Sequence, residues 1–158
     1  MPEIVIRSDN RSGDKENIIA RHRILYETEF GFNSDFGDYV EESLNDQYER
    51  IWIAECDGKF AGCIGLVVVD STAQLRWFLV EPRVRGMNIG RQLLKTLIGF
   101  CKERNYSNIF LWTVDELHAA RKLYEEFGFS LTETLPKRFL WGKSITEQRW
   151  DLSLEPNR

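Results

Sequence analysis

The sequence predicts a single α+β domain, and three observations lead to this prediction. Its 158 residues suit one domain and leave little room for a second. Strand-like apolar segments stand at both ends and in the centre of the chain, with helical periodicity between them. The three central strands follow one another through short turns, which indicates an antiparallel meander. We therefore expect a mixed, mostly antiparallel sheet of six to seven strands, flanked by about four helices.

The first third of the chain predicts one strand and two helices. Residues 4–6 form the strand, and the polar residues 9–14 form a turn. Apolar residues from Ile18 to Tyr26 recur at helical spacing, and this helix should end within residues 29–32. Ser34 or Asp35 is expected to cap a second helix that continues to about Leu44.

The central strands are expected at residues 50–56, 60–69 and 73–80, with turns at 57–59 and 71–72. A helix from Ile89 to about Arg104, a strand at 109–114 and a helix at 117–127 follow, and the second of these helices ends at Gly128. Residues 130–134 and 148–154 close the sheet, joined by a loop at Trp141-Gly142. We expect a parallel strand pair across the long helix. The domain spans residues 1–158, with poor order expected only at residues 155–158.

Charge and hydropathy exclude several classes of protein. The formal charge of −4 and pI of about 5.3, with basic residues scattered among carboxylates, argue against a nucleic-acid partner and slightly favour a cationic substrate. Residues 1–10 lack the apolar core of a signal peptide, and no apolar run reaches the ~20 residues of a membrane helix. We expect a cytoplasmic protein without a membrane partner.

The three cysteines, Cys56, Cys63 and Cys101, predict reduced core residues. Their number is odd and no CxxC spacing occurs, as expected of buried thiols in an intracellular protein. A nucleophilic cysteine would need His22 or His118, which are both distant in sequence. A zinc site has still less support, and no metal is expected.

The most informative segment is the turn Arg85-Gly86-Met87-Asn88-Ile89-Gly90, which follows a strand that ends at Pro82 and precedes a strong helix. The first amides of a helix have no intrahelical acceptor, and the helix dipole adds partial positive charge there. Glycines allow close approach to the backbone, and Arg85 and Arg91 add full charges. This arrangement can hold a pyrophosphate, although a Gly-x-x-x-Gly turn can also serve packing alone. The Rossmann and Walker A patterns are both absent.

This segment resembles motif A of the GNAT superfamily of N-acetyltransferases, Arg/Gln-x-x-Gly-x-Gly/Ala. Arg85, Ile89 and Gly90 match, whereas Asn88 replaces the usual middle glycine. Because Asn tolerates left-handed geometry, we expect the turn to survive. The resemblance implies a GNAT-like fold and acetyl-CoA as co-substrate, held by Leu79, Val80, Arg85, Gly86, Met87, Asn88, Ile89, Gly90 and Arg91.

A second block, residues 119–129, is similar to the family's Ala-x-x-Leu-Tyr-x-x-x-Gly-Phe motif. Leu117 stands where that motif usually has Asn. Two motifs about 30 residues apart, in the family's order and on the expected elements, are far more specific than either alone. Residues 77–80, 110–113 and 148–152 further resemble the acetyltransferase half of MarR-type regulator–acetyltransferase fusions. The chain is too short for their DNA-binding half, so no DNA binding is carried over.

The resemblance implies direct transfer of the acetyl group from acetyl-CoA to an amine. It places Tyr124 beside the sulfur as proton donor to the leaving thiolate, although Tyr124 could instead be a core residue. The backbone of Leu79 and Val80 should bind the pantetheine arm like an added strand, and the Val80 amide should polarise the thioester carbonyl.

The general base stays open, because Gln74 replaces the glutamate that many relatives carry before motif A. The alternatives are Glu81, Asp115, Glu116 and His118, although a surface role is the more common one for each of them. Trp77 and Trp112 could line the acceptor cleft or pack in the core. The loop at residues 29–32 could hold an amine with an apolar body, or simply join two helices.

The sequence therefore predicts an amine N-acetyltransferase that acts on a small-molecule or peptide amine as a monomer or homodimer. A CoA-binding sensor without catalysis is the main alternative, motivated by Asn88, Leu117 and Gln74. A small nucleic-acid-binding domain is a third, which the acidic charge disfavours. Specificity resides in loops, so the acceptor is not predicted.

Overall fold

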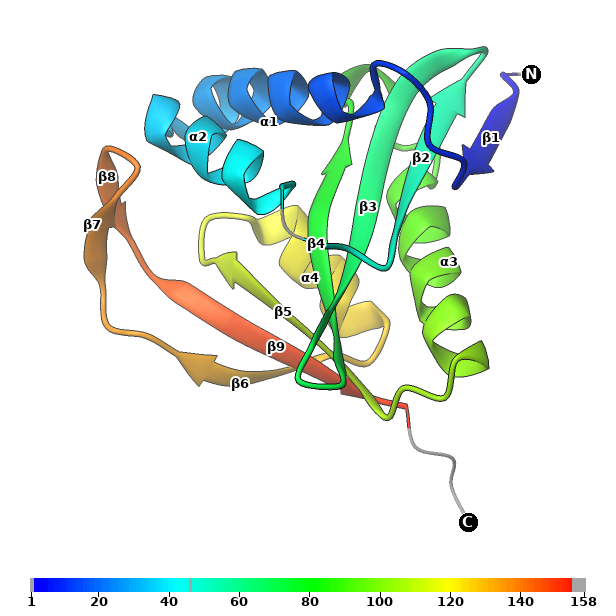
Figure 1. The fold of residues 1–158 in the computed structure, drawn as a ribbon. Helices are drawn as coiled ribbons and strands as arrows, with labels where there is room; N and C mark the ends of the chain where they lie inside the picture. The colour runs from blue at the N-terminus through cyan, green and yellow to red at the C-terminus, as the bar shows by residue number, and fades with distance from the viewer. Residues whose placement is uncertain (1, 46, 155–158) are drawn as a thin grey trace.

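The computed structural model describes residues 2–45 and 47–154 (Figure 1), so the expectation for residues 155–158 lies outside the described part of the chain. The elements, in chain order, are β1 (Ile4–Arg7), α1 (Asp14–Phe30), α2 (Ser34–Ser43), β2 (Arg50–Cys56), β3 (Lys59–Val69), β4 (Thr72–Val80), the short 3-10 helix η1 (Pro82–Val84), α3 (Ile89–Glu103), β5 (Asn108–Val114), α4 (His118–Glu126), β6 (Ser130–Thr134), β7 (Arg138–Leu140), β8 (Lys143–Ile145) and β9 (Glu147–Ser153).

Seven strands form one sheet in the order β1-β2-β3-β4-β5-β9-β6. All neighbours pair antiparallel except β4 and β5, which are parallel and are connected through α3. The predicted α+β class, the central meander and the single parallel pair are therefore confirmed.

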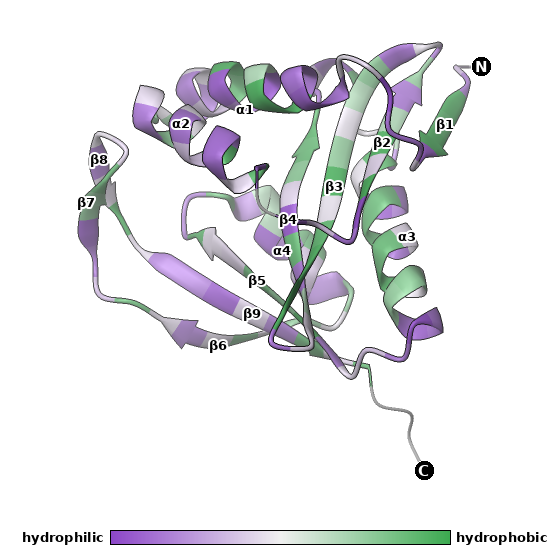
Figure 2. Ribbon diagram, viewed as in Figure 1, coloured by the Kyte–Doolittle hydropathy of each residue, from purple (hydrophilic) through white to green (hydrophobic). Residues whose placement is uncertain are grey.

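The core lies on both faces of this sheet. The helices α3 and α4 bury one cluster that includes Leu93, Leu97 and Leu111, while α1 and α2 bury a second that includes Ile18 and Phe36. The hydropathy pattern follows this arrangement, since β3 is largely hydrophobic whereas β9 carries many hydrophilic residues (Figure 2). Burial of these apolar faces drives the folding of the sheet between its two helical layers.

Three local predictions are corrected by the structure: the cap of α2, the turn before β4 and the loop around Trp141-Gly142. Asn33 caps α2, in place of Ser34 or Asp35, because its side-chain oxygen accepts the amide of Asp35 at 3.0 Å. The chain reverses between β3 and β4 at Asp70-Ser71, both with positive φ, one residue earlier than predicted.

Residues 138–145 form a hairpin, β7–β8, where the sequence suggested only a loop. Trp141 and Gly142 are its turn, with φ of 55° and 85°, the geometry of a two-residue type I′ turn. The strands have three residues each, too short for a recognisable alternation of apolar and polar side chains. The hairpin curves toward α2 (Figure 1).

The parallel pair β4–β5 opens soon after it begins. Pairing is confined to Ala73 with Ile109 and Gln74 with Phe110. The register of β4 with β3 then shifts, and Trp77 in this irregularity has a φ of 53°. The second half of β4 consequently presents an open edge toward β5.

His22 of α1 is 2% exposed, and its Nδ1 lies 2.7 Å from the Ile18 carbonyl oxygen, which requires a proton on that nitrogen. Burial lowers the pKa of His22 from 6.5 to about 4. A depressed folded-state pKa contributes stability that is complete above about pH 6.5 and is lost as the pH falls through about 4.

We expect the free energy of unfolding to fall between pH 6.5 and about 5, where few carboxylates titrate, with a limiting loss of about 3 kcal/mol at lower pH. Urea unfolding at several pH values measures it. His22→Phe should be flat over the same interval, and an equal slope in both proteins would contradict the assignment.

Candidate active site

A groove of ≈560 Å³ lies at the N-terminus of α3. Its walls are the end of α1, the second half of β4, the turn into α3 and the start of α4; we call it the α3 groove. Eight of the nine cofactor residues that the resemblance implies line it, namely Leu79, Val80, Arg85, Gly86, Asn88, Ile89, Gly90 and Arg91. Met87 instead packs against the core cluster under α3.

The turn into α3 leaves backbone amides at this groove without helical acceptors. Asn88 precedes the helix with φ 62° and ψ 21°, so it adopts the left-handed conformation expected of it. The first intrahelical bond is donated by the Gln92 amide to the Asn88 carbonyl, which leaves the amides of Ile89, Gly90 and Arg91 ahead of it. These amides and the helix dipole suit a phosphate, so the geometry fits the diphosphate of CoA.

Both arginines of the turn form ion pairs with carboxylates. Arg85 makes two hydrogen bonds of 2.6 Å to Glu29 at the end of α1, and Arg91 pairs with Glu126 of α4. The bonds from Arg85 lower the pKa of Glu29, which keeps it ionised. Because Glu29 lines the α3 groove as well, it places a negative charge beside the predicted phosphate site.

The backbone of Val80 faces the open edge of β4. The Glu81 amide donates to the Ala61 carbonyl at 2.8 Å, so these two residues occupy a hydrogen-bonded position of the β3–β4 ladder. Bonding alternates along an antiparallel pair. The backbone N–H and C=O groups of Val80, opposite Gly62, therefore point away from β3. Those of Leu79, opposite Cys63, point toward β3. A bond of 3.4 Å from Arg85 to the Val80 carbonyl agrees with this direction.

A second cavity, of ≈160 Å³, lies between α1, α2, the open β4–β5 region and the β7–β8 turn. Aromatic side chains dominate its lining, and we call it the aromatic cavity. Tyr124 of α4 lines it, is 4% exposed and packs on Phe78 and Phe129 with ring centroids 6.2 and 5.6 Å apart. Burial raises the pKa of Tyr124 far above its ordinary value, so the hydroxyl stays protonated and can donate.

The α3 groove and the aromatic cavity meet. Tyr26, Phe78, Leu117 and Ala120 line both. Leu117 thus stands at this junction, although it replaces a polar residue of the family motif. A reacting group extended along the α3 groove would reach the junction beside Tyr124.

The candidate bases are dispersed. Glu81 is buried and receives two hydrogen bonds of 2.7 Å from Arg21. Glu116 and His118 line the α3 groove, with Glu116 2.9 Å from Lys143. Asp115 lines neither hollow, while Gln74 lines the aromatic cavity and accepts a bond from Arg76.

Trp77 and Trp112 both line the aromatic cavity, the first buried and the second 37% exposed. The segment at residues 29–32 contributes to both hollows. Glu29 and Phe30 line the α3 groove, and Phe32 lines the aromatic cavity. Sequence reasoning missed Trp141 and Glu147, which also line that cavity. Neither belongs to a recognised motif, since Trp141 lies in the turn of the unpredicted hairpin and Glu147 is the first residue of β9.

None of the three cysteines lines the α3 groove or the aromatic cavity. Cys63 and Cys101 are buried, and burial raises the pKa of Cys101 to about 12, which opposes thiolate formation. Among the described residues, no cluster of His, Cys, Asp and Glu side chains could hold a metal ion. Within the same part of the chain, no helix combines the length and apolarity needed to span a membrane.

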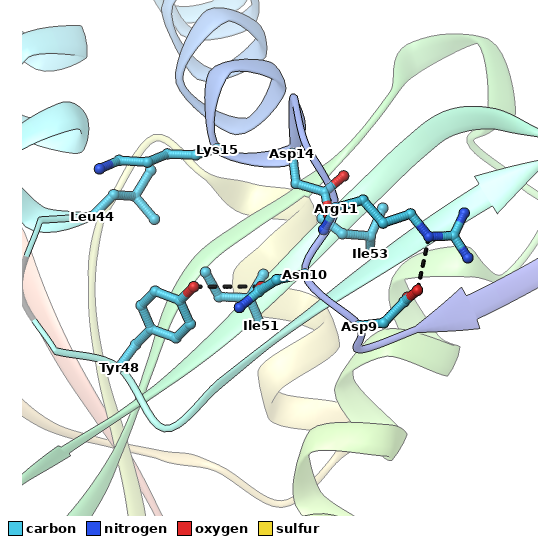
Figure 3. Close-up of a pocket in the computed structure, with 9 residues that line it drawn as sticks. All are labelled: Asp9, Asn10, Arg11, Asp14, Lys15, Leu44, Tyr48, Ile51 and Ile53. Atoms are coloured by element: carbon cyan, nitrogen blue, oxygen red, sulfur yellow. Dashed lines mark hydrogen bonds and ion pairs between the residues drawn. The ribbon is translucent and has the colours of Figure 1, made fainter.

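A third hollow, of ≈260 Å³, lies beside β2 near the start of α1 (Figure 3). It shares no lining residue with the α3 groove, and several of its polar side chains bind one another or neighbouring residues. Arg11 pairs with Asp9, and the Tyr48 hydroxyl lies 3.4 Å from Asn10.

Comparison with known proteins identifies relatives that are named as N-acetyltransferases or as an N-acetylaspartate synthetase. A putative ribosomal protein-alanine N-acetyltransferase of Bacillus subtilis is 30% identical over 57% of this chain, and a probable N-acetyltransferase camello of Xenopus tropicalis is 36% identical over 65%. A mouse N-acetylaspartate synthetase is 30% identical over 70%. The matches cover 60%, 49% and 38% of these relatives' own lengths.

Solved structures share the whole fold. A GNAT-family acetyltransferase of Staphylococcus aureus superposes with a TM-score of 0.78 at 26% identity, covering 97% of this chain and 100% of that one. A putative acetyltransferase of Salmonella typhimurium, solved with acetyl-CoA, has a TM-score of 0.74 at 17% identity, covering 99% and 96%.

The family evidence covers both motifs and the elements between them. Residues 19–129, from α1 through the end of α4, match the family described as the acetyltransferase (GNAT) family. Acetyl-CoA is the co-substrate of this family, and the α3 groove has the geometry to hold it. The chain belongs to the acetyltransferase (GNAT) family.

Proposed function

We propose that this protein transfers the acetyl group of acetyl-CoA to a primary amine. The observation that carries the proposal is the meeting of the α3 groove and the aromatic cavity at Tyr26, Phe78, Leu117 and Ala120. A groove suited to CoA opens there into a separate cavity for the acceptor. A CoA-binding protein without catalysis would not require the second cavity.

The binding roles follow from the backbone. The amides of Ile89, Gly90 and Arg91 bind the diphosphate, and Arg85 adds its charge when it exchanges Glu29 for phosphate. The open edge of β4 binds the pantetheine arm through Val80. Leu79 lines the same groove, but its backbone belongs to the β3 ladder.

The chemical roles follow from what surrounds the junction. The Val80 amide stabilises negative charge on the carbonyl oxygen as the amine nitrogen attacks the acetyl carbon. The new C–N bond forms as the C–S bond breaks, and Tyr124 gives its proton to the sulfur. The amine attacks in its neutral form, and the proton that its nitrogen then loses returns through solvent to the Tyr124 oxygen, so the products are the amide, the CoA thiol and unchanged protein.

Thiol release from acetyl-CoA, measured with a panel of primary amines, tests the proposal. We expect release that depends on the amine, and a raised melting temperature in the presence of CoA. CoA binding without turnover on any amine would favour a sensor. An unchanged melting temperature at millimolar CoA would remove the basis for the proposal.

The finer inferences rest on the sequence. A relationship to the acetyltransferase half of MarR-type fusions, a cytoplasmic location and a monomer or homodimer remain predictions. A peptide amine is favoured as acceptor only by the relatives named for ribosomal protein-alanine acetylation.

Removal of the negative charge at Glu29 should tighten CoA binding. Glu29→Gln releases Arg85 from its ion pair and removes repulsion toward phosphate. We expect the Kd for CoA, measured by calorimetry, to fall about two- to five-fold at low salt and less at high salt.

Glu49→Gln is the matched control, because Glu49 pairs with Arg104 at the other end of α3. Its Kd for CoA should equal that of the parent protein. Weaker binding in Glu29→Gln would show that Glu29 positions Arg85 for the phosphate and does not compete with it.

A further inference from the structure

Three walls of the aromatic cavity lie away from its junction with the α3 groove. The α1–α2 connection and α2 supply one wall, β4 and β5 the second, and the β7–β8 turn the third. Each contributes aromatic side chains, among them Phe32, Phe36, Tyr39, Trp77, Trp112 and Trp141. A cavity of ≈160 Å³ is small for a ligand site and suits one ring with a short linker.

The aromatic walls are held in place before any ligand binds. Trp141 contacts three rings, at centroid distances of 4.9 Å to Phe36, 5.3 Å to Phe32 and 5.6 Å to Tyr39. The Trp77 indole donates to the Ser43 hydroxyl at 2.8 Å. Such preorganisation reduces the entropy lost on binding.

The backbone fixes the β7–β8 turn against α2. The Asn33 amide donates to the Trp141 carbonyl at 2.9 Å. A Cβ atom on Gly142 would lie 2.9 Å from the Asn33 side chain, so the turn approaches as closely as glycine permits. The position of Trp141 is therefore determined by two elements.

The polar groups of the cavity are neutral or already paired. His22 is uncharged at neutral pH, Ser43 binds Trp77, and Glu147 receives a bond of 2.8 Å from Arg138. Thr113 has a buried hydroxyl without a hydrogen-bond partner among the described residues, which a ligand could satisfy. A second ammonium group on the acceptor would be buried without a free counter-ion, at high cost.

Given the proposed acetyl transfer, we infer that the acceptor is a small primary amine joined by a short carbon linker to a flat aromatic ring. The ring packs against Trp141 and Trp112, and the amine reaches the junction beside Tyr124. Edge and face contacts among aromatic rings favour such a ligand over an aliphatic chain of similar size. The carbon linker between the ring and the amine lies in the apolar part of the cavity, between the two tryptophans and the junction.

Steady-state kinetics with phenethylamine, tryptamine, spermidine and an alanine-initiated tripeptide test this inference. We expect kcat/KM at least ten-fold higher for the two aromatic amines. Transfer to spermidine or the peptide at equal or higher efficiency would overturn the aromatic assignment while leaving the acetyltransferase proposal intact. No transfer to any amine by protein that binds CoA would instead reject the proposed function.

Two variants localise the effect. Trp141→Ala and Trp112→Ala should each lower kcat/KM for phenethylamine at least ten-fold, mainly through KM, with the Kd for CoA unchanged. The matched control is Phe139→Ala on the same hairpin, since Phe139 is 76% exposed and lies outside the cavity lining. Unchanged kinetics in Trp112→Ala, whose side chain is the more exposed, would overturn the inference even if Trp141→Ala proved unstable.

Discussion

Tyr124→Phe should lower kcat at least ten-fold while the Kd for CoA and the melting temperature stay near those of the parent protein. The substitution removes only the hydroxyl and keeps the ring that packs on Phe78 and Phe129. Burial keeps this hydroxyl protonated, as a proton donor to the departing sulfur must be. Steady-state kinetics on an accepted amine measures the loss.

Tyr106→Phe is the control for this experiment. Tyr106 follows α3 and is absent from the lining of both hollows of the site, so its kcat should not change. The pH profile provides a second readout, because loss of the donor should slow breakdown of the C–S bond at every pH. A parental kcat in Tyr124→Phe would remove the proton-donor role.

The second large effect is expected at Gly90, where a side chain would narrow the α3 groove. A Cβ atom there would lie 3.3 Å from the Val80 side chain and 3.5 Å from Phe78. Gly90→Val therefore fills space in the groove beside Val80 and Phe78, and we expect the Kd for CoA to rise at least ten-fold. Calorimetry with CoA, supported by the loss of the CoA-dependent melting shift, measures it.

Gly99→Val is a matched control within the same helix. A Cβ atom on Gly99 has no heavy atom within 4 Å, so the substitution changes helix propensity without steric conflict. CoA should bind this variant as it binds the parent protein. If Gly90→Val also bound CoA normally, the diphosphate would have to lie elsewhere.

Much of the fold and of the cofactor site could be predicted because the signals are local. The meander follows from Asp57-Gly58 and the strand patterns around it, and the site at α3 follows from the unpaired amides at a helix start. Asn88 adopts the left-handed geometry that its short polar side chain tolerates. Each of these features depends on residues close together in sequence.

The acceptor side was not predictable in this way. Trp141 lies in the turn of a hairpin whose strands have only three residues each, and only its contacts with Phe32, Phe36 and Tyr39 make it part of a cavity. By sequence, Glu29 belonged to a loop that could hold an acceptor amine. In the structure its carboxylate lies 2.6 Å from the guanidinium of Arg85, which is 56 residues away.

By itself the sequence determined the α+β class, the family and the position of the cofactor turn, since hydrophobic period, turn chemistry and helix ends are properties of short segments. Only the tertiary structure decided which aromatic side chains form the second cavity, that it meets the α3 groove, and that Arg85 is paired with Glu29. The physical reason is that ring packing and ion pairing depend on distances between segments remote in sequence, which are set by how the whole sheet and its helices pack.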